Sequence, residues 1–326
     1  MSLATNTGPL EALRHSVTAA MLTPFDASGT PAVDAAGPYA ASLVLDGVGA
    51  LAVGAHTGRG LHLSDDARGA VVRAVREAVD VPVVAGVGLA GQGGDSPASV
   101  ERALARAGEE TAAAGADALL VYPVPRGAHP DVPGLHALVA RASGLPVIAF
   151  VLYEGASGQC YSADLARRLV ATEGVLGLKV AVLDDAVACQ DILTGCRAER
   201  AEAILFTGED RMFGPSLMWG ADAALVGIAA ALPRVTVDVV RAWTEERHSD
   251  FVRTSGVLDV LAALVFRAPV DFYVQRMAWL AGWEGRLPRR LCHDPGSAPS
   301  AERERRLFVA AAEAVLTRAV AVPPGP

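Results

Sequence analysis

The stretch "GVLGLKVAV", Gly174–Val182, decides the fold, because it is one of eight short apolar runs that recur along the chain. Each run is nearly continuous in apolar residues, which is typical of parallel strands covered on both faces. The runs are Ser16–Leu22, Gly49–Gly54, Val81–Gly88, Asp117–Pro123, Leu145–Val151, Gly174–Ala181, Ala203–Gly208 and Asp222–Ala230. Segments of helical period separate them, so the chain alternates strand and helix.

This alternation predicts the architecture. Eight β–α units over about 230 residues indicate an α/β fold, a (β/α)8 TIM barrel, with a doubly wound open sheet as the alternative. Helices are expected at Asp65–Val79 and Ser99–Gly115, with Ser64 and Ser99 as N-caps and Gly115 as a C-cap. From about Ser249 the pattern is helical throughout. We therefore expect a barrel over 1–247 that carries the active site and a C-terminal helical extension over 248–326.

The composition narrows the class of protein. The 326 residues are 52% hydrophobic and 20% charged, with a net charge of −8. That charge argues against nucleic-acid binding and against docking on an anionic membrane. No apolar run reaches the roughly 18 residues that span a bilayer, and the first residues lack the apolar core of a signal peptide. Four cysteines without a CxxC pair suit a reducing compartment, so we expect a cytoplasmic protein.

Lys179 is the only lysine in the sequence, although lysine and arginine together number 28. Mutational drift can exchange the two on a surface, and Lys179 could be the residue that drift left behind. However, only lysine offers an amine that can lose its proton when it is desolvated. Lys179 falls near the carboxyl end of the sixth run, where barrel residues face the active site. This is the setting that a Schiff-base lysine requires.

Two glycine-rich stretches could bind anions. "GVGLAG", Gly86–Gly91, has the spacing of a dinucleotide fingerprint, but it follows the third run and continues as a loop, so it is weak evidence. "VGAHTGRG", Val53–Gly60, follows the second run and places His56 and Thr57 among small residues. It is either an anion site or an ordinary surface loop. No histidines have metal-ligand spacing, and we expect neither a metal nor a cofactor.

Several segments together resemble the dihydrodipicolinate synthase / N-acetylneuraminate lyase family of pyruvate-dependent class I aldolases. "TAAMLTPFDASG" is similar to the opening strand of that family, and "VGAHTGRGLHLSDDAR" to its carboxylate-binding loop. "VPVVAGVG" is similar to the third strand and "GLKVA" to the Schiff-base strand. "FTGEDRMFGPSLMWGADAALVGIAAALP" is similar to the successive G-x-D, G-A-x-G-x-I-S and N-x-x-P motifs of the family. The resemblance covers roughly residues 16–235 and the helical region after them.

The resemblance also shows where this chain departs from the family. The loop motif TGE reads Thr57-Gly58-Arg59, and "YPVPRG" stands where the fourth strand usually ends in tyrosines. The catalytic tyrosine of the fifth strand corresponds to Phe150, with Tyr153 three residues later. No arginine lies near "EGASG", where dihydrodipicolinate synthase binds the second carboxylate of its aldehyde. The resemblance therefore implies a divergent member that is not a true dihydrodipicolinate synthase.

The function that the resemblance implies is a lyase or aldolase that forms a Schiff base between Lys179 and pyruvate or a related 2-oxo acid. His56 and Thr57, with loop amides, would hold the carboxylate, and Tyr153, or a water near Phe150, would transfer protons. The backbone at Gly208 and Val226 would line the pocket. Alternatives are a dehydratase of 2-keto-3-deoxy sugar acids that uses the same imine, and a barrel that binds a small carboxylate without turnover. We expect a homodimer or homotetramer, from the resemblance and from the apolar helices "DVLAALVF" and "FYVQRMAWL".

Overall fold

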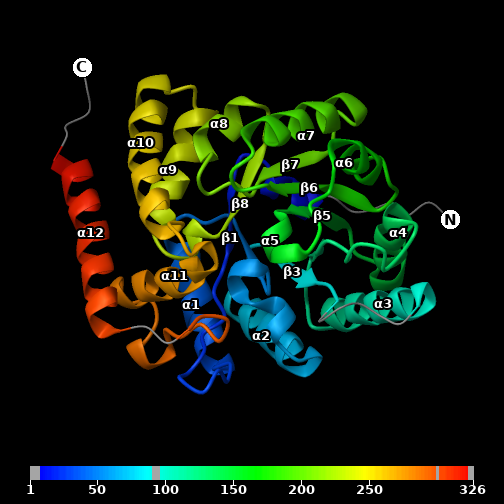
Figure 1. The fold of residues 1–326 in the computed structure, drawn as a ribbon, viewed down its shortest axis with the longest axis horizontal. Coiled ribbons are helices and arrows are strands. Elements are labelled where there is room, and N and C mark those ends of the chain that lie inside the picture. The colour runs from blue at the N-terminus through cyan, green and yellow to red at the C-terminus, as the bar shows by residue number, and fades with distance from the viewer. Residues whose placement is uncertain (1–7, 90–95, 299–300, 322–326) are drawn as a thin grey trace.

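The eight strands form one closed parallel barrel in chain order (Figure 1). A computed structural model of the chain describes residues 8–89, 96–298 and 301–321. The strands are β1 (Val17–Ala20), β2 (Ala50–Val53), β3 (Val83–Val87), β4 (Ala118–Val121), β5 (Val147–Leu152), β6 (Val175–Ala181), β7 (Ile204–Thr207) and β8 (Ala223–Val226). Because β1 pairs with both β2 and β8, the predicted (β/α)8 barrel is confirmed and the open sheet is wrong.

Helices surround the barrel and extend beyond it. Those within the β–α units are α1 (Val33–Leu45), α2 (Asp65–Ala78), α3 (Pro97–Ala113), α4 (Val132–Ser143), α5 (Glu154–Ser157), α6 (Ala163–Val170), α7 (Ala186–Glu199), α8 (Phe213–Met218) and α9 (Pro233–Thr244). The later ones are α10 (His248–Val265), α11 (Tyr273–Trp283) and α12 (Glu302–Ala321), and α12 packs against α10 and α11. Short 3-10 turns are η1 (Gly8–Leu13), η2 (His56–Gly58), η3 (Gly60–His62), η4 (Ile228–Ala230), η5 (Val270–Phe272) and η6 (Arg289–Leu291).

The helix starts depend on local capping. Ser64 caps α2 as predicted, since its side chain accepts a hydrogen bond from the Ala67 N–H. The N-cap of α3 is Ser96 and not Ser99, because Pro97 favours the first helical position and starts the helix earlier. Ser99 instead completes a capping box, in which each serine side chain accepts from the backbone N–H of the other.

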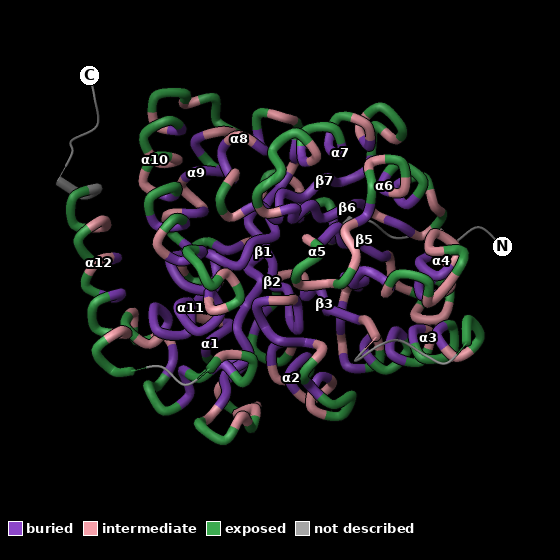
Figure 2. The backbone as a smooth tube through the Cα atoms, in the orientation of Figure 1, coloured by how far each residue is buried: buried purple, intermediate pink, exposed green. Residues whose placement is uncertain are grey.

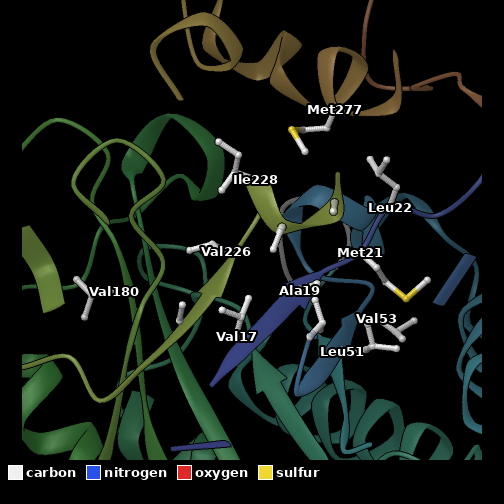
Figure 3. Packing of buried hydrophobic residues seen from close by; sticks show 14 of the residues in the cluster. Val17, Ala19, Met21, Leu22, Leu51, Val53, Val180, Val226, Ile228 and Met277 are labelled. Atoms are coloured by element: carbon white, nitrogen blue, oxygen red, sulfur yellow. The ribbon is translucent and has the colours of Figure 1, made fainter. Parts of the chain in front are cut away.

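The strands bury two apolar layers, one inside the barrel and one between the barrel and the helices. Figure 2 shows the strands of the barrel as buried. Alternate side chains along each strand point to opposite layers. The outer layer contains Val17, Leu51 and Val226, which Figure 3 shows in the same packed cluster as Ile228. Leu10 and Leu13 of η1 join the inner layer, and η1 directly precedes β1. They therefore fill the amino end of the barrel, and the carboxyl end is left for the site.

The C-terminal helices are continuous with the helical ring. α10 begins at His248 and packs against both α9 and α8. The division of the chain at residues 247 and 248 stays a prediction. Within the described residues, no helix combines the length and the apolar character that crossing a bilayer requires.

Candidate active site

A cavity lies at the carboxyl end of the barrel, and strands β2, β5, β6, β7 and β8 all contribute to its wall through their last residues or the loops after them. Its free volume is about 30 Å³. A water molecule needs about 10–15 Å³ by the same measure, so the cavity is narrow. The lining residues are His56, Thr57, Phe150, Leu152, Tyr153, Lys179, Ala181, Leu183, Gly208, Glu209, Asp210, Gly227, Phe266 and Tyr273.

Lys179 supplies the amine of this cavity. It lies on β6, level with Phe150 on β5 and Phe206 on β7, and it is 4% exposed. The Nζ atom is 4.2 Å from the centre of the Phe150 ring. Burial disfavours the ammonium ion and lowers the pKa of Lys179 to about 8, although Asp210 and Glu209 oppose part of the shift. A substantial fraction of the amine is therefore neutral, and able to act as a nucleophile, near neutral pH.

Gly208 makes room for the lysine side chain. A Cβ at this position would lie 2.7 Å from Cε of Lys179 and 2.8 Å from the carbonyl oxygen of Val180. The Gly208 N–H donates to that same carbonyl, with an N–O distance of 2.6 Å. The strand end at Gly208 therefore has no space for a side chain, and Lys179 extends across it.

Two carboxyl groups flank the amine from the loop after β7. Glu209 accepts hydrogen bonds from the N–H groups of Val182 and Leu183, and Asp210 accepts one from the Ile228 N–H at 2.7 Å. Burial raises the pKa of Glu209 to about 8 and that of Asp210 to about 6. Asp210 thus carries the negative charge that faces Lys179 at neutral pH, whereas Glu209 is largely protonated.

His56 and Thr57 lie in the 3-10 turn after β2, and both contact Tyr273. The Tyr273 hydroxyl is 2.9 Å from Nδ1 of His56 and 3.1 Å from Oγ1 of Thr57. Burial, with the nearby charge of Arg59, lowers the pKa of His56 to about 4, so its ring is neutral. The N–H groups of Gly58 and Arg59 donate within the turn, to Ala55 and His56. These two N–H groups are therefore committed to the turn and are not available to an anion.

Tyr153 lies at the start of α5, beside the mouth of the cavity. Its hydroxyl donates to Oδ1 of Asp271, at 2.9 Å, and its ring meets that of His56 edge-on. Asp271 belongs to η5 in the C-terminal region. Tyr153 and Tyr273 thus approach the cavity from different parts of the chain, one from the end of β5 and one from the extension.

The turn after β2 is held by a buried ion pair. Nε and Nη2 of Arg59 lie 2.8 Å and 2.7 Å from the two carboxylate oxygens of Asp294. Arg59 has a φ of 53°, in the left-handed region, and it is 7% exposed. Its Nη2 also donates to the carbonyl of Asp271, at 3.2 Å. The departure from the TGE motif therefore places a structural cation here, and the cation does not line the cavity.

The structure brings most of the predicted site residues together. Six of them line the one cavity, namely Lys179, Tyr153, His56, Thr57, Phe150 and Gly208. Val226 is not among the lining residues, and alternation along β8 sends its side chain to the outer layer, so the role assigned to its backbone stays a prediction. The next residue, Gly227, is the one that lines the cavity. Among the described residues, no group of three or more His, Cys, Asp or Glu side chains is arranged to hold a metal ion.

Comparisons with known proteins agree with this arrangement. The sequence profile of the dihydrodipicolinate synthetase family matches residues 14–313. The chain belongs to this family. It is 30% identical over 286 residues to 4-hydroxy-tetrahydrodipicolinate synthase of Bifidobacterium longum strain DJO10A, covering 86% of this chain and 88% of that protein. It is 33% identical over 229 residues to 4-hydroxy-tetrahydrodipicolinate synthase 1 of Streptomyces coelicolor, covering 69% and 70% of the two chains.

Solved structures agree on the fold. A prophage protein of the dihydrodipicolinic acid synthase family from E. coli K12, solved with pyruvate, aligns with a TM-score of 0.78 at 19% identity, over 92% of this chain and 98% of that one. A dihydrodipicolinate synthase from Agrobacterium tumefaciens also aligns with a TM-score of 0.78, at 20% identity, over 94% of this chain and 99% of that one. Members of the family are lyases of the class I aldolase type, and this chain is an enzyme of that type.

Sequence reasoning missed several residues of the cavity wall. Glu209 and Asp210 lie within the segment that resembles the G-x-D motif of the family, and their position directly after the seventh run was a usable signal. Tyr273 and Phe266 come from the region after the barrel. No spacing rule connects that region to the β2 loop, because the contact depends on how the extension folds back.

Proposed function

We propose that this enzyme forms a Schiff base between Lys179 and pyruvate, or a related 2-oxo acid, and then makes or breaks a bond at the carbon next to the imine. The observation that supports this most is the placement of the only lysine, buried in a cavity at the carboxyl end of a barrel strand. A buried amine of lowered pKa is a nucleophile at neutral pH, whereas an exposed one is mostly protonated.

The proposed chemistry begins at the amine. The neutral Nζ attacks the ketone carbon of the 2-oxo acid, and loss of water gives an iminium ion. Removal of a proton from the adjacent carbon moves an electron pair into the new C=C bond and gives an enamine. The enamine then attacks an aldehyde, and the reverse sequence cleaves an aldol. Two phenols of the cavity wall, Tyr153 and Tyr273, are candidates for these proton transfers.

We assign the carboxylate of the 2-oxo acid to the turn after β2. The Thr57 hydroxyl and the neutral His56 ring can each donate a hydrogen bond to it. Gly227 keeps this side of the cavity open, since a Cβ there would lie 2.8 Å from Oγ1 of Thr57. Hydrogen bonds to a charged partner contribute about 1.5–3 kcal/mol each, which is enough to orient a small acid.

The aldehyde partner of this enzyme differs, in our proposal, from that of a true dihydrodipicolinate synthase. Among the residues that the structure describes, no arginine lines the cavity, while Glu209 and Asp210 do. The negative charge of Asp210 beside the amine disfavours an acceptor that carries a second carboxylate. A neutral or hydroxylated aldehyde, or a 2-keto-3-deoxy sugar acid undergoing dehydration by the same imine, suits this wall better.

One observation favours the synthase as a second candidate, namely the name carried by the relatives at 30% and 33% identity. The two candidates differ in the acceptor. Purified enzyme incubated with pyruvate and a panel of acceptors, including aspartate semialdehyde, hydroxylated aldehydes and 2-keto-3-deoxy sugar acids, gives the product of the favoured reaction by mass spectrometry. Turnover of aspartate semialdehyde above all others would support the synthase and contradict our proposal.

Borohydride trapping tests the imine itself. Reduction in the presence of pyruvate fixes the imine as a stable secondary amine, and the chain offers one ε-amine besides its N-terminus. We expect the added mass on the peptide that contains Lys179. If pyruvate and related 2-oxo acids all leave this peptide unchanged, the enzyme does not use the Schiff base, and a barrel that binds carboxylates without turnover becomes the better description.

We also propose that the chain works as a homodimer or homotetramer in the cytoplasm. Its four cysteines are free thiols, which suits a reducing compartment. α11 gives the assembly little support, because its side chains from Tyr273 to Ala281 are buried within the chain and only Trp283 at its end is exposed. On α10, by contrast, Val252 and Val260 are 71% and 49% exposed and remain available to a second copy. Light scattering at micromolar concentration tests the assembly against the monomer mass of 33.5 kDa.

A further inference from the structure

The phenol of Tyr273 occupies the centre of a hydrogen-bonded group in the cavity wall. It comes from the first residue of α11, outside the β–α units, and it is 5% exposed. Its hydroxyl is shared between Nδ1 of His56 and Oγ1 of Thr57. These are the two side chains that we assign to the carboxylate of the substrate. The phenol therefore lies beside the position that we propose for a bound 2-oxo acid.

We propose that Tyr273 is the group that carries protons to and from the substrate at the Lys179 imine, with His56 as the partner that takes or returns the proton. This inference rests on the proposed function, since it names the proton-transfer group of the same reaction. It assigns to the C-terminal extension a catalytic residue that the strands of the barrel do not provide.

The hydrogen bonds can run in either direction, which the reaction requires. In one direction, Thr57 donates to the Tyr273 oxygen and Tyr273 donates to Nδ1 of His56. In the other direction, Nδ1 of His56 carries the proton and donates to Tyr273, which then donates to Thr57. The His56 ring is neutral, so one of its nitrogens has a free lone pair. An aldol reaction needs such a group, because one step releases a proton from the substrate and another returns it.

The first step conserves atoms and electrons. The carbon next to the imine gives its proton to the Tyr273 oxygen, and the phenol hydrogen passes to Nδ1 of His56. The electron pair of the broken C–H bond forms the C=C bond of the enamine, and the nitrogen of Lys179 accepts the imine π electrons. Burial raises the pKa of Tyr273 well above its usual value, so the phenolate does not accumulate and both transfers occur together.

The other aromatic residues of the wall suit this role less well. Phe150 has no hydroxyl, and its ring lies against Nζ of Lys179. Tyr153 directs its hydroxyl hydrogen to Asp271, away from the two carboxylate-binding side chains. Gly227, on the other hand, favours Tyr273, because a Cβ there would lie 3.2 Å from Cε2 of its ring and 2.8 Å from Thr57. The wall is thus shaped around the contact between Thr57 and Tyr273.

Exchange of the pyruvate methyl hydrogens in heavy water tests the proposal without an aldehyde. Imine formation makes these hydrogens acidic, and each enamine that is reprotonated takes a deuteron, which proton NMR detects. For Tyr273→Phe we expect the borohydride adduct on Lys179 to persist while exchange falls by about 10²–10⁴-fold. Tyr153→Phe tests the competing phenol of the cavity wall, and we expect it to lose less exchange than Tyr273→Phe. Tyr161→Phe is the matched control, since Tyr161 is a buried phenol whose oxygen accepts from the Val124 N–H instead.

Each outcome is decisive. Wild-type exchange in Tyr273→Phe, or loss of exchange in Tyr153→Phe alone, overturns the inference while leaving the Schiff base intact. Absence of both adduct and exchange in the wild type overturns the proposed function and this inference with it. Should Tyr273→Phe fail to fold, His56→Asn decides, because its amide oxygen keeps a hydrogen-bond acceptor near the Nδ1 position but cannot take up a proton. We then expect the adduct on Lys179 to persist while exchange is lost, and wild-type exchange in His56→Asn contradicts the proposal.

Discussion

Arg59 binds Asp294 through both oxygens of its carboxylate, and this contact joins the turn after β2 to the segment that precedes α12. Both side chains are almost fully buried. Arg59 also contacts the segment that holds Tyr273, since its Nη2 donates to the carbonyl of Asp271, two residues before Tyr273. One ion pair therefore holds together the turn after β2 and the segment that carries Tyr273, both of which line the cavity.

Replacing Asp294 by Asn should destabilise the fold strongly. It leaves the Arg59 guanidinium buried without its charge partner, and breaking a buried pair from one side costs about 3–5 kcal/mol. Denaturant unfolding measures this loss. Glu302→Gln is the matched control, because Glu302 pairs with Arg305 at the surface, and we expect its unfolding midpoint to be unchanged. Equal midpoints for the two variants would contradict a structural role for the pair.

The same ion pair should make the folded state less stable at low pH. Burial alone would raise the pKa of Asp294, but Arg59 outweighs burial, and the pKa lies below its usual value. A carboxyl with a lowered folded-state pKa contributes stability above the unfolded value, about 3.9, and loses it as pH falls through the folded value. Thermal unfolding at pH 7 and pH 3 should therefore show a smaller acid loss in Asp294→Asn than in the wild type.

Lys179→Arg should fold and lose turnover. The guanidinium stays charged and is a poor nucleophile, so we expect no borohydride adduct and a rate loss beyond the roughly 10²–10⁴-fold of a missing proton-transfer group. Peptide mapping after reduction with pyruvate checks the adduct, and circular dichroism checks the fold. A retained rate in Lys179→Arg would mean that the reaction does not pass through this amine.

Imine formation should rise with pH, with a midpoint near pH 8. The neutral amine is the reactive form, and the pKa of Lys179 is about 8 rather than 10.5. At pH 7 about a tenth of such an amine is neutral, against about 0.03% for an ordinary lysine. Initial rates of trapping from pH 5.5 to about 9.5 measure the midpoint. Asp210 and Glu209 face the amine, so Asp210→Asn should shift the midpoint downward.

Thr57→Val should weaken pyruvate binding by about 10- to 150-fold, which corresponds to the loss of about 1.5–3 kcal/mol from one hydrogen bond to a charged group. The half-saturating pyruvate concentration for trapping measures the effect. Thr236→Val removes another buried hydroxyl, which donates to the Leu232 carbonyl in α9, and should leave this concentration unchanged. Unchanged affinity in Thr57→Val would place the carboxylate elsewhere.

Gly208→Ala should displace the lysine. The added methyl group meets Cε of Lys179 and the carbonyl of Val180 at distances that require a shift of the strand end. We expect the trapping rate to fall by at least about tenfold, because Nζ no longer points into the cavity. Gly256→Ala in α10 meets open space and should instead raise stability by about 0.5–1 kcal/mol. Wild-type trapping in Gly208→Ala would show that the backbone there adapts.

The sequence was sufficient to predict the barrel because each strand can be recognised locally. Continuous apolar runs with β-branched residues marked all eight positions, and their number and spacing predicted the parallel closure. Lys179 and Phe150 could be placed for the same reason, since a residue near a strand end in a barrel faces the site. The layer that the Val226 side chain enters could not be predicted, because a side chain changes layer at every step along a strand and the register is not visible in an apolar run.

The contribution of the C-terminal extension could not be predicted. Tyr273 meets a loop that is more than 200 residues earlier in the chain, and Asp294 meets Arg59 across a similar separation. Such contacts depend on the packing of α10 and α11 against the barrel, and a single sequence holds no periodic signal for them. Arg59, which stands where the TGE motif of the family has glutamate, was the only local sign that this loop contacts a different partner.

The return of the extension to the barrel mouth has a consequence for how the enzyme is made. On the ribosome, β6 and its lysine emerge well before Tyr273, and Asp294 emerges later still. A nascent chain can therefore close its barrel around β8 while the turn after β2 still lacks its charge partner and its phenol. Maturation of the catalytic pocket is thereby coupled to the release of the last segment, so a ribosome-stalled or C-terminally truncated product would carry the amine without the surroundings that make it selective.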